Sequence, residues 1–137
     1  MHFTYEEKLA TLYVASAIAA SDGDMVKDES LFRGKVAIFL GLSNDDNMAL
    51  QSMKLETACQ IIRDMSTENK RFTAAVMTYM KYVDGYVRSE ETHAIQLIST
   101  VSTLPAVDKE EAYNLLKSLG IIGSKMELIW GTLRHGC

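Results

Sequence analysis

A chain of 137 residues that is 47% hydrophobic and 23% charged has the size and composition of one globular domain, and its single proline leaves little scope for disordered linkers. A net charge of −4 argues against a nucleic-acid-binding protein, because such proteins usually present a basic surface to the phosphates. The longest apolar stretch, residues 9–20, is too short to span a bilayer, which takes ~20 residues. Residues 1–7 lack the basic region of a secretory signal, so we expect no membrane insertion and a cytoplasmic location.

The first half of the chain shows helical patterns separated by stop signals. Residues 4–7 form a capping box that begins a helix ending near Ser21, and its apolar residues lie almost all round the helix. This is typical of a central helix that is covered on several sides. Gly23 then provides a helix end. Further helices are expected over residues 28–40, 43–53 and 55–65.

The second half continues in the same way. Ser66 or Thr67 caps a long helix, and Ser89, followed by two acids, is the predicted N-cap of the next. The expected helices cover residues 67–83, 89–105, 108–119 and 124 onward. No alternating β-branched run is bounded by turn signals. The sequence therefore predicts an all-α class, a compact single domain over residues 1–137 with about seven to eight helices.

One acidic motif occurs twice. Residues 22–29 begin with Asp-Gly and end with two acids, and residues 84–91, 62 positions later, do the same. The matched positions are Asp22/Asp84, Gly23/Gly85, Asp28/Glu90 and Glu29/Glu91. Each copy lies between two helical segments. We therefore predict an internal duplication of a helical hairpin, with repeat halves centred on 22–29 and 84–91 and related by a pseudo-twofold axis.

The acids of the motif allow three interpretations. Carboxylates at a helix start stabilise the helix by ~0.3–1 kcal/mol, so the turns fit a purely structural scaffold. Alternatively, Asp22, Glu29, Asp84 and Glu91 converge and bind a divalent cation; ligands that are all oxygens suit Mg²⁺, Ca²⁺ or Mn²⁺. The third interpretation is an acidic docking surface for a basic partner, without a metal.

Neither turn is an EF-hand. Counted from Asp22, the fifth position holds Val26 and the twelfth holds Arg33, where an EF-hand needs an oxygen ligand and a bidentate glutamate. Counted from Asp84, the twelfth position is Ile95. A metal site here is of another kind.

The two motifs, as residues 21–29 and 83–91, resemble those of the TerB-like tellurite-resistance family, whose pattern is similar to Ala-Asp-Gly-x-Val-x-x-x-Glu. Ser21 and Val83 replace the family's alanine, and Met25 replaces its branched apolar residue in the first copy. The resemblance covers roughly residues 4–107. It implies a compact helical bundle, a non-catalytic role in stress-response or membrane-linked complexes with a protein partner, and an acidic metal-binding site. It does not imply that this chain confers tellurite resistance.

Other residues suggest no catalytic chemistry. The sequence contains no nucleophile elbow, phosphate-binding glycine loop or HExxH, so we expect that the protein is not an enzyme. Cys59 and Cys137 lack metal-ligand spacing, and His93 is interpreted as a surface or partly buried residue. Most methionines lie on apolar helical stripes and are predicted core residues.

The apolar residues around Trp130 form a candidate homodimer patch. Two function classes stay open, a metal-responsive interaction module and a structural scaffold.

Overall fold

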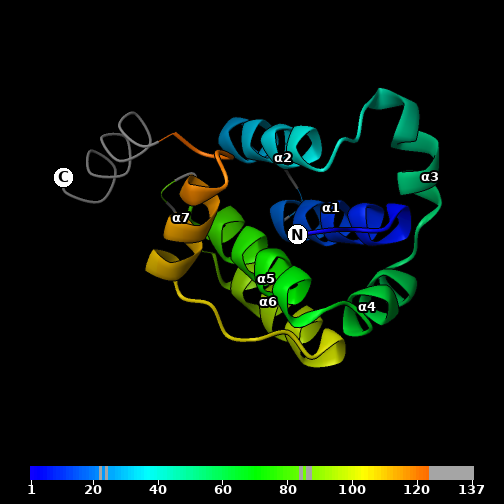
Figure 1. Cartoon of the computed structure of the whole chain (residues 1–137). Coiled ribbons are helices and arrows are strands. Elements are labelled where there is room, and N and C mark those ends of the chain that lie inside the picture. The colour runs from blue at the N-terminus through cyan, green and yellow to red at the C-terminus, as the bar shows by residue number, and fades with distance from the viewer. Residues whose placement is uncertain (22, 24, 84, 86–87, 124–137) are drawn as a thin grey trace.

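The computed structural model describes residues 1–21, 23, 25–83, 85 and 88–123, and the regular structure in these ranges is helical (Figure 1). The helices are α1 (Tyr5–Ala19), α2 (Lys27–Phe39), a 3₁₀ turn (Asn44–Asp46), α3 (Asn47–Ser52), α4 (Leu55–Arg63), α5 (Thr67–Tyr82), α6 (Ser89–Ser102) and α7 (Lys109–Ser118). The predicted all-α single domain is confirmed, with seven α-helices and no strand in these ranges. The helix expected from residue 124 lies outside the described residues. No helix of the described part is long and apolar enough to cross a membrane.

Side-chain caps begin several helices where the sequence predicts them. The Thr4 hydroxyl accepts a hydrogen bond from the Glu7 N–H at 3.2 Å, and the Glu7 carboxylate accepts one from the Thr4 N–H at 2.9 Å. The Ser66 hydroxyl accepts from the Asn69 N–H at 3.1 Å, and Asp108 caps α7 in the same way. These bonds satisfy backbone donors that the first turn of a helix leaves without intrahelical partners.

The start of α6 differs from the prediction by one residue. Ser89 is the first helical residue, and Arg88 occupies the N-cap position with extended backbone (φ −106°, ψ 143°) and no capping bond from its side chain. α2 also begins after an extended residue without such a bond, Val26 (φ −75°, ψ 166°). A serine hydroxyl therefore does not set the start of α6. Both helices instead carry a buried glutamate as their third residue, Glu29 or Glu91.

α1 and α5 form the centre of the fold (Figure 1). α1 packs against α2, α4, α5 and α6, and α5 packs against α2, α6 and α7 as well. α4 contributes Cys59, which is buried as predicted. The central position predicted for the first helix is confirmed, and its buried residues are Leu9, Ala10, Thr11, Leu12, Val14, Ala15, Ile18 and Ala19.

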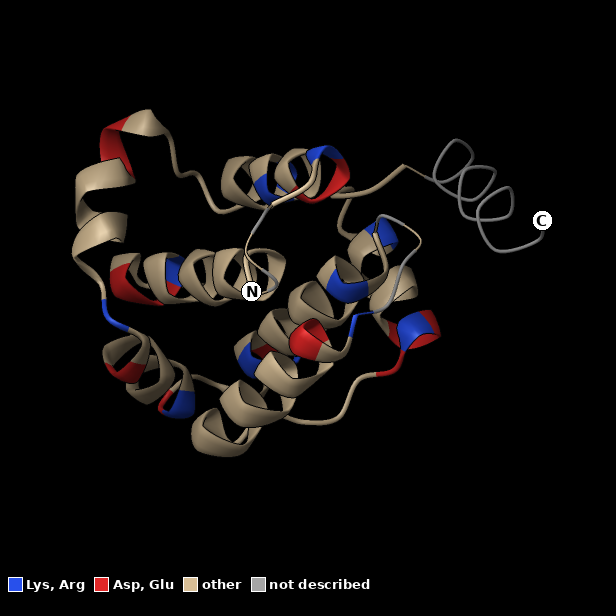
Figure 2. Cartoon of the chain, turned by 180° about the vertical axis from the view of Figure 1, so that it is seen from behind, with Lys and Arg blue, Asp and Glu red and all other residues tan. Residues whose placement is uncertain are grey.

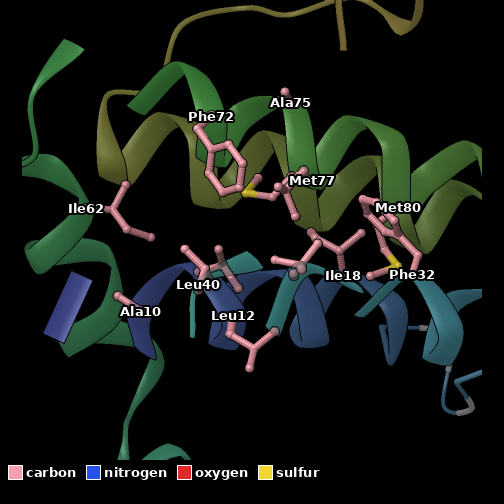
Figure 3. Close-up of a cluster of buried hydrophobic side chains, with 14 of the residues drawn as sticks. Ala10, Leu12, Ile18, Phe32, Leu40, Ile62, Phe72, Ala75, Met77 and Met80 are labelled. Carbon is pink, nitrogen blue, oxygen red and sulfur yellow. The ribbon is translucent and has the colours of Figure 1, made fainter. Parts of the chain in front are cut away.

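Figure 3 shows the hydrophobic core where α1, α2 and α5 meet. Phe72, Met77 and Met80 of α5 are fully buried, and Ile18 of α1 and Phe32 of α2 belong to the same cluster. Full burial of side chains of this size contributes roughly 1.5–3 kcal/mol each. The burial of Met77 and Met80 agrees with the core position predicted for most methionines, whereas Met48 is 81% exposed.

Local structure recurs at an offset of 62 residues. The starts of α1 and α5 are 62 residues apart, at residues 5 and 67, and so are those of α2 and α6, at residues 27 and 89. Thr11 and Thr73, separated by the same offset, form a buried hydrogen bond of 3.0 Å between their hydroxyls. Contact between a residue and its own counterpart is what a twofold relation produces. The duplication and a pseudo-twofold axis relating the whole halves both stay predictions.

Candidate functional site

The two acidic turns lie at matching places, one between α1 and α2 and the other between α5 and α6. Of the four predicted ligands, Asp22 and Asp84 lie outside the described residues. Glu29 and Glu91 are described, and each is 0% exposed. Ionised carboxylates are seldom fully buried, because removing them from water is costly unless another group compensates their charge. The sequence identifies these two acids, but their burial is a property of the packed fold.

A glycine shapes each turn. Gly23 (φ 106°) and Gly85 (φ 84°) have left-handed backbone, which glycine adopts without the strain that a Cβ would cause. The Gly23 N–H donates to the Ala20 carbonyl and the Gly85 N–H to the Tyr82 carbonyl, each at 3.0 Å. The C-caps of α1 and α5 are Ala20 and Val83, so both glycines shape the turns beyond the helix ends, and α1 ends before the position predicted at Gly23. The next helix of each hairpin can then bring its third residue back towards the turn.

Glu29 faces the backbone of its own turn. Its Oε1 accepts a hydrogen bond from the Val26 N–H at 3.0 Å. Its Oε2 is buried and has no hydrogen-bond partner among the described residues. No Lys or Arg of the described part lies within salt-bridge distance of this carboxylate. One carboxylate oxygen is thus satisfied by capping, and the other retains its capacity to bind a donor or a cation.

Glu91 has a charged neighbour. Arg88, at the N-cap position, brings its Nη1 to 3.6 Å from Glu91 Oε1, and the Arg88 side chain is 28% exposed. Because the pair is largely shielded from water, its attraction is stronger than that of an exposed ion pair. Arg88 is absent from the predicted site residues. The available signal was the alignment of the two motifs, which matches Arg88 with Val26.

Figure 2 shows the starts of α2 and α6 as separate places on the molecule, each with basic and acidic residues close together. Convergence of all four predicted carboxylates on one ion stays a prediction, because two of the four lie outside the described residues. Within the ranges that the structure describes, no group of three or more His, Cys, Asp or Glu side chains is arranged to hold a metal.

His93, the histidine nearest the acids in sequence, is exposed on α6. It lines a shallow surface depression together with Ser89, Glu90, Thr92 and Gln96. The interpretation of His93 as a surface residue is confirmed.

Asp46 is a third acidic group with defined partners, at the start of α3. Its carboxylate accepts hydrogen bonds from the Ser43 N–H at 2.8 Å and from the Tyr5 hydroxyl at 2.7 Å. These two bonds, the backbone one first, lower the pKa of Asp46 below its ordinary value of 3.8. The same contact raises the pKa of the Tyr5 hydroxyl. The Tyr5–Asp46 hydrogen bond joins the beginning of α1 to the segment before α3.

No family model matches the chain, and no curated protein matches it. Among solved structures, the chain is similar to a crystal structure of a protein of unknown function from Porphyromonas gingivalis W83. The two are 25% identical, with a TM-score of 0.71, over 85% of this chain and 92% of the other. The helical fold thus has a counterpart of nearly the same extent.

Proposed function

We propose that this chain is a non-catalytic, TerB-like interaction module of stress-response or membrane-linked complexes, and that its acidic turns bind a divalent cation, Mg²⁺, Ca²⁺ or Mn²⁺. The observation that carries the proposal is the complete burial of Glu29 and Glu91 at matching positions of the two hairpins. A hard cation would offset the cost of burying these carboxylates through ligation by oxygen.

A purely structural scaffold is the second candidate. It is favoured by the hydrogen bond from the Val26 N–H to Glu29, which is an ordinary helix cap. Capping alone does not need burial, however. Glu7 makes the same contact with Thr4 at the start of α1 and keeps part of its surface in water. The burial of Glu29 therefore favours the cation-binding proposal.

The cation part is tested by thermal unfolding of metal-free protein with millimolar Mg²⁺, Ca²⁺ or Mn²⁺, each against EDTA. A ligand that binds only the folded state adds ~2.7 kcal/mol at a hundred times its Kd, so a rise in Tm is expected with at least one ion. Glu29→Gln should reduce this rise, whereas Glu7→Gln, at the surface cap, should preserve it. An unchanged Tm of the wild-type protein at millimolar ion contradicts cation binding. The purely structural scaffold is then the favoured function.

Exposed apolar side chains support the interaction role. On α2, Leu31 is 56% exposed and Ile38 is 78% exposed, and they lie two helical turns apart on one face. A protein partner or a second copy would cover such a face, and the candidate dimer residues around Trp130 lie outside the described residues. Light scattering over a concentration series, with Ile38→Asp as the comparison, tests self-association. A monomer at all concentrations rejects the homodimer and leaves a different protein as the partner.

A further inference from the structure

The two acidic turns share their backbone plan but differ in one side chain. Each places an extended residue before its second helix and a fully buried glutamate three residues later. The extended residue is Val26 in the first turn and Arg88 in the second. An arginine carries a permanent positive charge, and a valine carries none. The two buried glutamates therefore have different charge compensation at matching places.

In the second turn, the chain supplies the positive charge itself. Arg88 Nη1 lies 3.6 Å from Glu91 Oε1, and the Glu91 side chain is 0% exposed. A guanidinium at this distance offsets part of the cost of removing the carboxylate from water. A second cation near Glu91 would be repelled by Arg88.

In the first turn, no Lys or Arg of the described residues forms the corresponding ion pair with Glu29. Glu29 is equally buried, its Oε1 accepts the Val26 N–H, and its Oε2 has no hydrogen-bond partner among the residues described. The apolar Val26 can neither pair with this oxygen nor repel a cation. Glu29 thus combines full burial and a carboxylate oxygen without a hydrogen-bond partner, and no Lys or Arg of the described part forms an ion pair with it.

We infer that the two turns are unequal: a divalent cation binds at the first turn through Glu29, and Arg88 takes the place of that cation at the second. This inference rests on the proposed cation binding and refines it, because it replaces one ion shared by four carboxylates with one ion at a single turn. It gives a stoichiometry of one ion per chain. It also makes the residue before the helix, Val26 or Arg88, the determinant of which turn binds.

The test moves the arginine from one turn to the other. Val26→Arg gives the first turn the side chain of the second, and the extended backbone at Val26 resembles that at Arg88, so the substitution fits locally. Calorimetric titration with Mg²⁺, Ca²⁺ and Mn²⁺ should show binding weakened by about tenfold or more, as expected when a like charge is placed a few ångströms from the ion. Val26→Gln, a long side chain without charge, should keep the affinity within about threefold of the wild type.

The reciprocal variant removes the internal charge. Arg88→Gln should lower the Tm in EDTA, because it leaves Glu91 without its guanidinium, and added ion should restore it. The stoichiometry should rise from about one to about two ions per chain. Should Val26→Arg fail to fold by circular dichroism, this variant decides the question.

The possible failures are distinguishable. No ion response in the wild-type protein removes the proposed cation binding altogether. A clear wild-type response with equal affinity in Val26→Arg overturns the inference while cation binding stands. An Arg88→Gln variant that still binds one ion with unchanged Tm in EDTA also overturns it, because Arg88 then compensates nothing.

Discussion

The starts of α1 and α2 use the same hydrogen bond in different surroundings. At α1, the Glu7 carboxylate accepts the Thr4 N–H at 2.9 Å, and at α2, the Glu29 carboxylate accepts the Val26 N–H at 3.0 Å. The N-cap backbones are nearly identical, with φ and ψ of −70° and 167° at Thr4 and −75° and 166° at Val26. Glu7 remains in contact with water, whereas Glu29 is 0% exposed. Local capping explains the hydrogen bond, and only packing explains the burial.

Charge reversal should separate the two glutamates most strongly. Glu29→Lys places an uncompensated ammonium in the buried site, and we expect it to lower the free energy of unfolding by about 3 kcal/mol or more. Glu7→Lys loses a cap and a favourable dipole interaction at the surface, and should cost about 1 kcal/mol or less. Urea denaturation followed by circular dichroism measures both. Equal losses would show that the burial of Glu29 has no energetic consequence.

The Thr11–Thr73 pair sharpens the comparison, because it is a buried polar contact in which both partners are present. Thr11→Val leaves the Thr73 hydroxyl without this partner and should cost ~1–3 kcal/mol, as should Thr73→Val. The double variant should cost less than the two single losses added together, since it removes both hydroxyls. Urea denaturation of the four proteins gives the coupling energy. Strict additivity would mean that the hydroxyls do not interact in solution.

A smaller change would make α2 begin as α1 does. Val26→Thr places a hydroxyl on backbone that matches that of Thr4, where the hydroxyl accepts the N–H three residues later. We expect stabilisation of up to about 1 kcal/mol. Val26→Ala, which brings no hydroxyl, should give no gain in a parallel thermal unfolding experiment. Failure of the threonine variant to exceed the alanine variant would show that the burial around Glu29 prevents capping by the N-cap side chain.

The smallest effect is expected at Asp46, a partly exposed residue whose pKa the bonds from Ser43 and Tyr5 lower. A carboxyl group with a lowered pKa in the folded state stabilises the protein above its unfolded pKa, near 3.8, and this contribution is lost as the pH falls through the folded value. Asp46→Asn should therefore be less stable than the wild type at neutral pH, with a difference that shrinks below about pH 4. Urea denaturation at neutral and acidic pH measures it. A difference in the free energy of unfolding that does not change with pH contradicts this account. Tyr5→Phe, which removes the hydroxyl that donates to Asp46, measures the contribution of the tyrosine.

Much of the fold could be predicted from the sequence because its signals act over a few residues. The Thr4–Glu7 capping box and the Asp108 cap need only neighbours three positions away, and the apolar stripes define which helix faces are buried. The start of α6 was misplaced by one residue because Ser89 carries a strong local signal, whereas the structure begins the helix after Arg88. The candidate site was only partly predictable. The motif repeat identifies Glu29 and Glu91, but the role of Arg88 depends on its distance from Glu91.

The sequence by itself determined the all-α class, most helix boundaries and the positions of two matching acidic turns, since helix propensity, capping and hydrophobic periodicity are local properties. Only the tertiary structure decided that Glu29 and Glu91 are completely buried and that the hydroxyls of Thr11 and Thr73 meet across α1 and α5. Burial and contact depend on which helices pack together, and local sequence patterns do not predict a contact between residues 62 positions apart. The charge difference between the turns follows from sequence and structure together. The alignment of the two motifs matches Val26 with Arg88, and the packed fold places Arg88 beside the buried Glu91.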